Sequence, residues 1–321
     1  MHHNRSGLSS SGGSDKGIAW RRDDSETCTR VAIDESWSIV PINSRATVTT
    51  ARILSNRKVG AYHHIALEAG EVGKLAKPGN FIAIAVGGEY SAMPLHRAFA
   101  IYRAKADGVH ASTVEIIVAA HGKGSEWLTK QSEGSQLRIT GPLGTSFPLP
   151  AEPVNVAIVG GGYGSAPLFD LADHLKSRGC RVDAVIGAST SSKIFAPLDG
   201  KRTVNSVTVT TEDASAGVQG RVTDVLEELI ERQKIDLIYS CGPMAMLKAV
   251  DEIAQRKQIP HLVSVEEAMA CGIGICMTCV LPIRDANGTI KMSRTCIEGP
   301  VIDSERVVWS GGIPEGTWGA P

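Results

Sequence analysis

Four cysteines near the end of the chain constrain its fold more than any other feature. They are Cys271, Cys276, Cys279 and Cys296, with the spacing C-x4-C-x2-C-x16-C. The first three lie within nine residues and have glycines between them, so the backbone can fold tightly around one small group. This spacing is typical of a plant-type [2Fe–2S] cluster. The alternatives are a zinc site, which usually uses two separated C-x2-C pairs, and a disulfide with two spare thiols.

The size and charge of the chain limit its classes of function. Its 321 residues, 42% of them hydrophobic, suffice for two or three domains with buried cores. Its 33 basic and 34 acidic residues nearly cancel, which gives no electrostatic basis for binding nucleic acid or an anionic membrane. The sequence has neither an apolar run of the roughly twenty residues that span a membrane nor the apolar core of a signal peptide. Clustered cysteines fit a reducing compartment, so a cytoplasmic location is predicted.

The first 43 residues differ from the rest of the chain. Residues 1–43 are rich in serine, glycine and charge and have no sustained apolar periodicity. They are predicted to form a disordered or loosely docked extension, in which Trp20, Trp37 and Ile39 are the only apolar anchors. An extension without a function is favoured over a partner-binding arm, and Cys28 is expected to be a bystander.

A series of short β-like segments then defines a second region, residues 44–150. Their length and even spacing, with Pro-Gly and Gly-Gly turns between them, indicate a six-stranded antiparallel barrel rather than a parallel sheet. The six segments are Ala46–Leu54, His63–Ala69, Phe81–Val86, Phe99–Arg103, Thr113–Ala119 and Gln136–Thr140.

The pattern changes in residues 151–261, where apolar strands alternate with helices. Such alternation predicts a doubly wound parallel sheet. The strands are Val154–Val159, Val182–Gly187, Val207–Thr211, Ile235–Ser240 and Leu262–Val265, and the helices are Ala166–Ser177, Val222–Gln233 and Met244–Gln258. Residues 262–321 form a small C-terminal region that contains the four cysteines. The cysteine segment follows directly on the last strand, so the cluster is expected at the edge of this nucleotide-binding domain.

A glycine-rich turn joins the first strand of this sheet to its first helix. It consists of Gly160, Gly161, Gly162, Tyr163 and Gly164. Such a turn brings the backbone close to a pyrophosphate, while the helix directs its N-terminal N–H groups at it. An ordinary strand-to-helix turn is the alternative, but the flanking strand and helix favour dinucleotide binding. No acidic residue follows the second strand, and Ser189 or Lys193 could accept a 2′-phosphate, so NADH and NADPH are not distinguished.

A second turn of the same sheet contains Cys241, Gly242 and Pro243, which end a later strand and precede a helix. This places them at the carboxyl edge of the sheet, where ligands bind, so Cys241 is predicted to face a cofactor. The alternative is a small buried side chain, which is a common environment for a free cysteine and the one expected for Cys180.

Two segments of the barrel carry another set of candidate binding residues. Arg97 and Phe99 lie at the start of a strand, and Gly122–Ser125 follows the strand that ends at Ala119. Arg97 alone could be a surface charge, and Gly122–Ser125 alone could be a loop whose serine caps a helix. Together, an arginine and the N–H groups of a helix start are what a second pyrophosphate requires. The histidines of the barrel show no metal-ligand spacing.

Two further motifs surround the cysteines: Met269-Ala270-Cys271-Gly272-Ile273-Gly274 and Cys296-Ile297-Glu298-Gly299-Pro300-Val301. With the barrel, the sheet and the cysteines in this order, the chain resembles the ferredoxin-reductase superfamily. The resemblance covers about residues 46–309 and is closest to the electron-transfer subunits of class B dihydroorotate dehydrogenase. That family implies FAD on the barrel and NAD(H) on the sheet. It also implies an FMN-containing partner subunit that oxidises dihydroorotate in pyrimidine biosynthesis.

The resemblance assigns candidate residues to each cofactor. FAD would be held by Arg97, Ala98, Phe99, Ala100, Gly122, Lys123, Gly124 and Ser125, with Ile117, Val118 and Ala119 lining the flavin through their backbone. NAD(H), with NADP(H) as the alternative, would be bound by Gly160, Gly161, Gly162, Tyr163, Gly164, Cys241, Gly242 and Pro243. The cluster would be held by Cys271, Cys276, Cys279 and Cys296. No residue of this chain is predicted to be catalytic.

The chain departs from the family at one motif. Similar members read Leu-Arg-Arg-Pro-x-Ser-Ile where this chain has His96, Ala98 and Ala100. The absence of a serine hydroxyl at Ala100 removes a hydrogen bond near the reactive flavin nitrogen, which affects the tuning of the flavin more than its binding.

The first hypothesis is an electron-transfer subunit of a hetero-oligomer. It would pass electrons between NAD(H), FAD and the cluster to or from a dihydroorotate dehydrogenase-type catalytic subunit or another redox partner. The exposed apolar side chains expected around the cluster are Ile273, Ile275 and Met277, which would form a dry contact with that partner. The alternatives are a flavoprotein subunit of the NAD(P)H:ferredoxin or sulfide dehydrogenase type and a non-catalytic assembly subunit.

Overall fold

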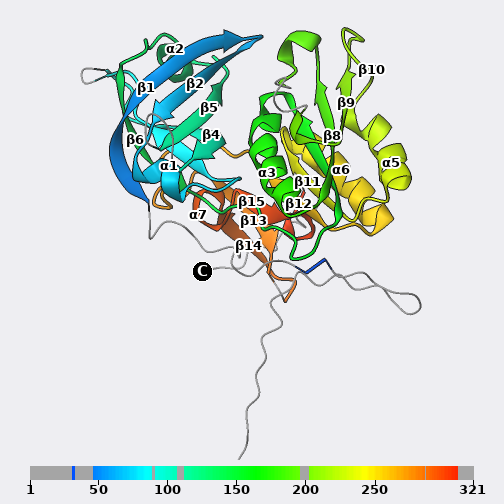
Figure 1. Cartoon of the computed structure of the whole chain (residues 1–321). Coiled ribbons are helices and arrows are strands. Elements are labelled where there is room, and N and C mark those ends of the chain that lie inside the picture. Colours follow the sequence, from blue (N-terminus) through cyan, green and yellow to red (C-terminus); the bar gives the residue numbers. More distant parts are fainter. Residues whose placement is uncertain are drawn as a thin grey trace, which may run out of the picture.

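The structure is a computed structural model, and it describes residues 31–32, 46–88, 91–106, 112–195, 202–285 and 287–309. Figure 1 shows two bodies side by side, a barrel in blue to cyan and an α/β domain in green to yellow. The C-terminal segment, in orange to red, lies below and between them. Among the described residues, no helix has the length and apolar character needed to cross a membrane.

The first body is a closed antiparallel barrel, as predicted. Its strands are β1 (Thr47–Val59), β2 (Tyr62–Glu68), β3 (Phe81–Ile84), β4 (Arg97–Lys105), β5 (Thr113–Val118) and β6 (Gln136–Leu143). They pair in the order β1-β2-β5-β4-β3-β6, and the long strand β1 closes the barrel by pairing with both β2 and β6. Side chains alternate along each strand, so Ile53, Ile65 and Ile116 fill the interior. Helices α1 (Glu71–Leu75) and α2 (Lys123–Thr129) lie in the connections.

The second body is a doubly wound sheet, also as predicted. Its strands are β7 (Asn155–Gly161), β8 (Arg181–Ala188), β9 (Ser206–Thr211), β10 (Val218–Gln219), β11 (Leu237–Cys241) and β12 (His261–Ser264). Helix α3 (Ala166–Ser177) packs on one face, and helices α5 (Val222–Gln233) and α6 (Met244–Lys257) pack on the other. The strand order is β10-β9-β8-β7-β11-β12, all parallel. The order reverses beside β7, which is where ligands bind in such sheets.

The C-terminal segment contacts both bodies. It contains the hairpin β13 (Val280–Arg284) and β14 (Ile290–Arg294), helix α7 (Thr295–Glu298), strand β15 (Val301–Asp303) and the 3₁₀ turn η5 (Ser304–Arg306). Strand β15 adds an antiparallel edge to the sheet by pairing with β12. The cysteines lie elsewhere: Cys279 and Cys296 are buried against Phe81, Ala83 and Leu143 of the barrel. The expectation of a cluster at the edge of the nucleotide-binding domain is therefore wrong, because the apolar outer surface of β3 and β6 attracts the cysteine loop to the barrel.

A short part of the N-terminal extension is docked on the two bodies. Val31 is buried in the core that also contains Phe147 and Leu149, and the Ala151 N–H donates to the Ala32 carbonyl at 2.6 Å. These contacts lie at the connection between the barrel and the sheet. The other predicted features of the extension, Trp20, Cys28, Trp37 and Ile39, lie outside the described residues.

Candidate functional site

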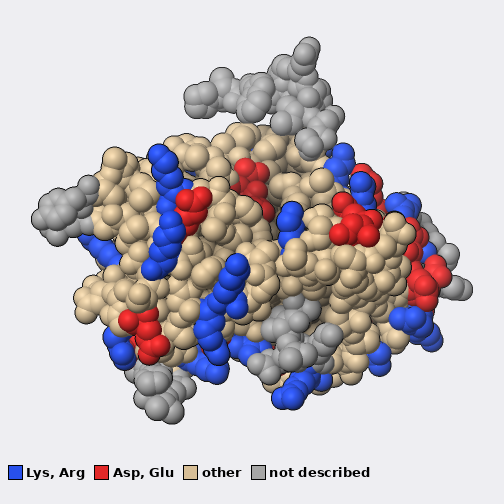
Figure 2. All heavy atoms as spheres, turned by 90° about the horizontal axis from the view of Figure 1, so that it is seen from above, with Lys and Arg blue, Asp and Glu red and all other residues tan. Residues whose placement is uncertain are grey.

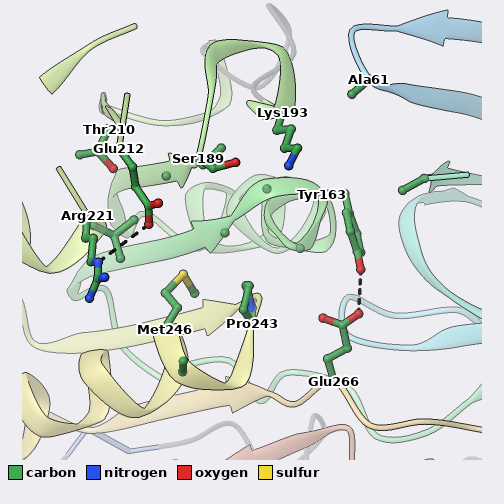
Figure 3. A pocket seen from close by; sticks show the side chains of 18 of the residues that line it. Ala61, Tyr163, Ser189, Lys193, Thr210, Glu212, Arg221, Pro243, Met246 and Glu266 are labelled. Carbon is green, nitrogen blue, oxygen red and sulfur yellow. Dashed lines mark hydrogen bonds and ion pairs between the residues drawn. The ribbon is translucent and has the colours of Figure 1, made fainter. Parts of the chain in front are cut away.

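A cavity of about 650 Å³ lies between the barrel and the carboxyl edge of the sheet. Its barrel side is formed by the β1–β2 turn, at Ala61 and Tyr62, and by Ala119 to His121 after β5. Its other walls are the glycine turn, the ends of β8 and β9, and the start of α6 (Figure 3). A cavity of this size is typical of a small-molecule site.

The two turns predicted to bind a dinucleotide meet at this edge. Strand β7 ends in the glycine turn, which continues as a 3₁₀ turn, η3 (Gly162–Ser165), into α3. A methyl group on Gly164 would lie 2.7 Å from the Gly242 Cα, so only glycine lets the turns approach so closely. Gly161, Gly162, Tyr163, Gly164 and Pro243 line the cavity, while Gly160, Cys241 and Gly242 form the layer behind them.

Cys241 lies behind the cavity wall rather than in it. Burial raises the pKa of its thiol to about 12, with a hydrogen bond to Ser264 acting in the opposite direction. The thiol is therefore protonated at neutral pH and is a weak nucleophile. The position of Cys241 therefore fits a small, partly buried side chain at least as well as a side chain in direct contact with a cofactor.

Tyr163 connects the glycine turn to the barrel and to the C-terminal segment. Its hydroxyl donates to the Glu266 carboxylate at 2.8 Å (Figure 3). Its ring centroid lies 5.9 Å from that of Tyr62 and 5.8 Å from that of His121. Burial, followed by the hydrogen bond to Glu266, raises the pKa of Tyr163 far above its ordinary value. The hydroxyl thus remains a donor across the physiological pH range.

An acidic group that the sequence reasoning missed lies at the other end of the cavity. Glu212 follows β9 and lines the cavity with Thr210, Ser189 and Arg221. The Arg221 Nε lies 3.8 Å from the Glu212 Oε1. The sequence pattern indicates an acid only directly after β8, whereas the pairing of β8 with β9 brings Glu212 to the same place.

The barrel brings its predicted FAD residues together at one end of β4. Arg97 begins β4, and its Nη1 donates to the Leu95 carbonyl at 2.8 Å. Its side chain lies against Gly124 in the first turn of α2, where an added Cβ would be 2.7 Å from the Arg97 Nε. Ser125 closes this turn by accepting from the Gly122 N–H at 3.1 Å. An arginine and free N–H groups at a helix start form a cradle that fits a pyrophosphate.

The strand residues assigned to the flavin differ in exposure. Ala100 is exposed, Ala98 and Phe99 are half-buried, and Lys123 is exposed. The side chains of Ile117 and Val118 are buried in the barrel, which leaves only their backbone for a ligand, and Ala119 lines the cavity. The burial of Ile117 and Val118 fits the predicted lining of the flavin by backbone atoms. The assignment of all these residues to FAD stays a prediction.

The four predicted cluster ligands form two neighbouring pairs. The Cys276 N–H donates to the Cys271 Sγ at 3.4 Å, and the Ile275 N–H to the same sulfur at 3.3 Å. The Cys279 and Cys296 thiols are hydrogen-bonded to each other and buried. No three His, Cys, Asp or Glu side chains of the described residues gather around a point that would suit a single metal ion. Two thiol pairs suit two irons, whereas zinc requires four ligands around one centre.

The protonation of these thiols also fits a metal centre. Hydrogen bonds from Thr278 and Cys271 lower the pKa of the exposed Cys276 thiol to about 6. Burial, followed by the hydrogen bond and charge of Cys279, raises the pKa of Cys296 to about 12. A bound cation deprotonates a coordinating thiol, so Cys296 would ionise on binding iron. The six cysteines in the described part of the chain are free thiols.

The surface around the cysteine loop is apolar. Ile273, Ile275 and Met277 are exposed, Ile275 by 76%. Three exposed apolar side chains in five residues mark a surface suited to another protein. Elsewhere, Figure 2 shows Lys and Arg next to Asp and Glu on both halves of one face. Charges on that face are mixed rather than gathered by sign.

Comparison with known proteins gives consistent matches. Residues 266–308 match the model of the iron–sulfur cluster binding domain of dihydroorotate dehydrogenase B. The dihydroorotate dehydrogenase B (NAD(+)) electron transfer subunit of Caldanaerobacter subterraneus is 35% identical over 81% of this chain and 98% of the relative. The electron transfer subunit of Desulforamulus reducens is 33% identical over 77% of this chain and 92% of the relative.

A solved structure resembles most of this chain. It is that of the NADH-dependent reduced ferredoxin-NADP oxidoreductase, described for its flavin-based electron bifurcation. It matches with a TM-score of 0.71 and 28% identity, over 81% of this chain and 90% of that chain.

Proposed function

This chain belongs to the family of dihydroorotate dehydrogenase B electron-transfer subunits, and from that membership we propose that it carries electrons between NAD(H) and a catalytic subunit. The observation that supports this most directly is the position of the cysteine loop. Cys279 and Cys296 pack in one core with Phe81 and Ala83 of β3, and Ala98 of β4 packs against the same core. The cluster ligands thus lie beside the strand that would hold the flavin.

The chain uses FAD, NAD(H) and an iron–sulfur cluster of the [2Fe–2S] type. When bound, FAD exchanges a hydride with NAD(H) and single electrons with the cluster. The protein supplies position: we propose that Arg97 and the start of α2 hold the FAD pyrophosphate, and that the backbone of Ile117 to Ala119 lines the ring. NAD(H) would lie along the cavity, with its pyrophosphate at Gly161 to Gly164.

An aromatic group lies between the two proposed nucleotide sites. Tyr62, Tyr163 and His121 form an aromatic group where the sheet edge faces the barrel. The Tyr62 hydroxyl donates to the Lys193 carbonyl at 2.7 Å, which ties the barrel to the loop after β8. No side chain of this chain is required to move a proton.

The partner is a catalytic subunit, so the functional protein is a hetero-oligomer. We propose that this subunit contains FMN, and that Ile273, Ile275 and Met277 form its contact. A cytoplasmic location and the boundaries 1–43, 44–150, 151–261 and 262–321 are part of the same proposal. The location is supported by the clustering of the cysteines, and the boundary at 150 by the change there from the barrel to the parallel sheet. The boundary at 261 falls within strand β12.

A second function is favoured by one observation. The bifurcating NADH-dependent ferredoxin-NADP oxidoreductase matches 81% of this chain at 28% identity. A subunit of that type would serve a ferredoxin-linked partner instead of a dihydroorotate-oxidising one. The lower identity places it behind the first proposal.

Anaerobic spectroscopy tests the function. The full chain, reconstituted alone and with the catalytic subunit of the same source, is expected to show both flavin and iron–sulfur absorbance. Stopped-flow mixing with NADH should bleach the flavin, and dihydroorotate should do so only when the catalytic subunit is present. Reduction by NADH together with reactivity towards ferredoxin, but not dihydroorotate, would favour the second function. A chain that binds FAD and never accepts a hydride would be an assembly subunit, and the absence of both chromophores would refute the proposal.

A further inference from the structure

We propose that Arg294 is a positioning residue for the iron–sulfur cluster. It fixes the peptide between Gly274 and Ile275 so that the peptide N–H points at the Cys271 sulfur, and it thereby raises the reduction potential of the cluster. The inference rests on the proposed function, because it requires that the four cysteines hold iron. Arg294 is the last residue of β14 and lies two positions before Cys296. It is not a ligand, and it acts through the backbone of the cysteine loop.

One peptide unit links Arg294 to a predicted cluster ligand. The Arg294 Nη1 donates to the Gly274 carbonyl at 3.0 Å. On the other side of the same peptide, the Ile275 N–H donates to the Cys271 Sγ at 3.3 Å. The C=O and N–H of a planar trans peptide point in opposite directions, so a donor that fixes the carbonyl also fixes the direction of the N–H. Arg294 therefore orients a hydrogen bond to Cys271.

Gly274 is packed tightly at the point where Arg294 contacts it. Its φ of 81° lies in the region that favours glycine, and an added Cβ would collide with the Ile297 side chain of α7. Its backbone is also hydrogen-bonded to the Cys296 thiol. Gly274 thus lies between the two thiol pairs, with α7 on one side and the Arg294 guanidinium on its carbonyl.

A carboxylate holds the guanidinium in turn. The Arg294 Nη2 lies 3.6 Å from the Glu298 Oε1, and the Glu298 Oε2 accepts from the Ser293 hydroxyl. The side chains of Arg294 and Glu298 are 37% and 35% exposed, so water screens the direct effect of their charges on the loop. The influence of Arg294 should therefore be transmitted mainly by the hydrogen-bonded peptide, because hydrogen bonds in a chain polarise one another.

This arrangement favours the reduced form of the cluster. The potential of an iron–sulfur cluster depends on its net charge and on the hydrogen bonds to its sulfurs. An added electron makes the cluster more negative, so a donor to a ligand sulfur stabilises the reduced form. A guanidinium on the carbonyl strengthens the N–H of the same peptide as a donor. Loss of Arg294 should therefore lower the potential.

Arg294→Met and Arg294→Lys test the inference in the full chain with its catalytic subunit. Methionine has a similar length but donates no hydrogen bond, whereas lysine keeps the charge and a donor. In a redox titration monitored by EPR, R294M should shift the reduction equilibrium about fivefold towards the oxidised form. This is about 40 mV, since tenfold is about 59 mV for one electron. R294K should recover most of that shift.

Glu298→Gln is a second, independent variant. It removes the negative partner of Arg294 while leaving the guanidinium on the Gly274 carbonyl. The potential should then rise, by the equivalent of about twofold in the reduction equilibrium, because the guanidinium is no longer partly neutralised. Opposite shifts in R294M and E298Q would support the inference. If R294M retains no cluster, E298Q decides: a raised potential supports the inference, and an unchanged one overturns it.

Arg284→Met is the matched control. Arg284 is an exposed residue at the end of β13, and it lies at the opposite end of the hairpin from Arg294, which pairs with Val280. R284M removes the same charge and should leave the potential unchanged. Equal shifts in R284M and R294M would overturn the inference.

Two further outcomes separate the inference from simpler explanations. A lower iron content in R294M with an unchanged potential would mean that Arg294 only supports the loop, and would overturn the inference. Failure of the unmodified protein to form any cluster would refute the proposed function and the inference with it. A cluster that NADH reduces in the unmodified protein, with the same potential in R294M, would refute the inference alone.

Discussion

The dinucleotide cavity and the cysteine loop hold their binding groups in different ways. In the cavity, the groups come from the ends of β7, β8, β9 and β11 and from the barrel, and the strand register brings them together. In the loop, three of the four thiols lie within nine residues, and one hairpin delivers Cys296 to them. The cavity therefore depends on the whole sheet, whereas the loop depends on a short stretch and its support by the barrel.

This difference predicts two kinds of response to mutation. A metal cluster held by four ligands fails when one is removed, because the others cannot complete its coordination. A dinucleotide bound by many backbone contacts loses affinity gradually, because each contact supplies only part of the binding energy. A mutation in the cavity should leave the cluster intact, and a mutation in the cysteine loop should leave dinucleotide binding intact. The exceptions are mutations in the elements that support both regions.

The largest effect is expected from Cys296→Ser. Cys296 is fully buried beside Cys279, so a hydroxyl at this position would be a poor iron ligand in an apolar core. Iron should fall from about two atoms per chain to nearly none, with loss of the visible iron–sulfur absorbance. NADH should still bind. Iron analysis, spectroscopy and NADH titration measure these outcomes.

Cys180→Ser controls for the loss of a buried thiol. Cys180 lies in the core of the sheet, away from the loop. This variant should keep its full iron content. An intact cluster in Cys296→Ser would show that the loop does not use this ligand, and the contrast between the two regions would then fail.

A smaller, graded effect is expected from Gly164→Ala. The new Cβ would lie 2.7 Å from the Gly242 Cα, so the two turns of the cavity must separate. The N–H groups of the turns are then displaced from the dinucleotide, and NADH affinity should fall by about tenfold, as for the loss of one or two hydrogen bonds. The iron content should not change.

Gly134→Ala is the control for this substitution. No atom lies within 4 Å of an added Cβ at Gly134, but its φ of 86° makes alanine strained there. It should lower stability by about 1–2 kcal/mol and leave NADH affinity unchanged. Unchanged NADH affinity in Gly164→Ala would instead place the dinucleotide elsewhere.

The same contrast explains what could be predicted from the sequence. The cysteine spacing is a local signal, and in the structure the predicted ligands form two pairs, Cys271 with Cys276 and Cys279 with Cys296. The glycine turn and Cys241–Pro243 were also recognisable, because each joins a strand to a helix. The barrel and the sheet follow from the periodicity of their segments, and helices α3 and α5 have the predicted bounds.

What could not be predicted depends on contacts between distant segments. Glu212 reaches the end of β8 only through strand pairing, and its own sequence context gives no binding motif. The docking of the cysteine loop on β3 and β6 requires an apolar outer barrel surface that strand alternation alone does not reveal. Strand β15 was missed because it is short and joins the sheet antiparallel to its neighbour.

The smallest effect is expected in the framework that links the two regions. Helix α3 begins at the glycine turn and packs on β4, and it carries the buried residue Asp170. Burial raises the pKa of this carboxyl from 3.8 to about 7, while Arg103 on β4 opposes the shift and Asp173 and Glu115 add to it. The folded protein thus retains a proton that the unfolded chain releases. Stability should fall as pH rises from about 4 to about 7.

Asp170→Asn should remove this dependence. A shift of three pKa units corresponds to about 4 kcal/mol in the free energy of unfolding. Because the variant also loses a negative charge near Arg103, part of this is offset, and its free energy of unfolding should be higher by about 2 kcal/mol at pH 8. At pH 4 the gain should be small, because the carboxyl is then protonated in the folded protein and already partly protonated in the unfolded chain. Thermal unfolding at pH 4, 6 and 8 measures the trend. A variant that is less stable at pH 8 would mean that the Asp170 charge is compensated by Arg103. Unchanged NADH affinity and iron content would locate the effect in the framework, whereas a loss of either would show that the cavity and the loop are coupled through α3.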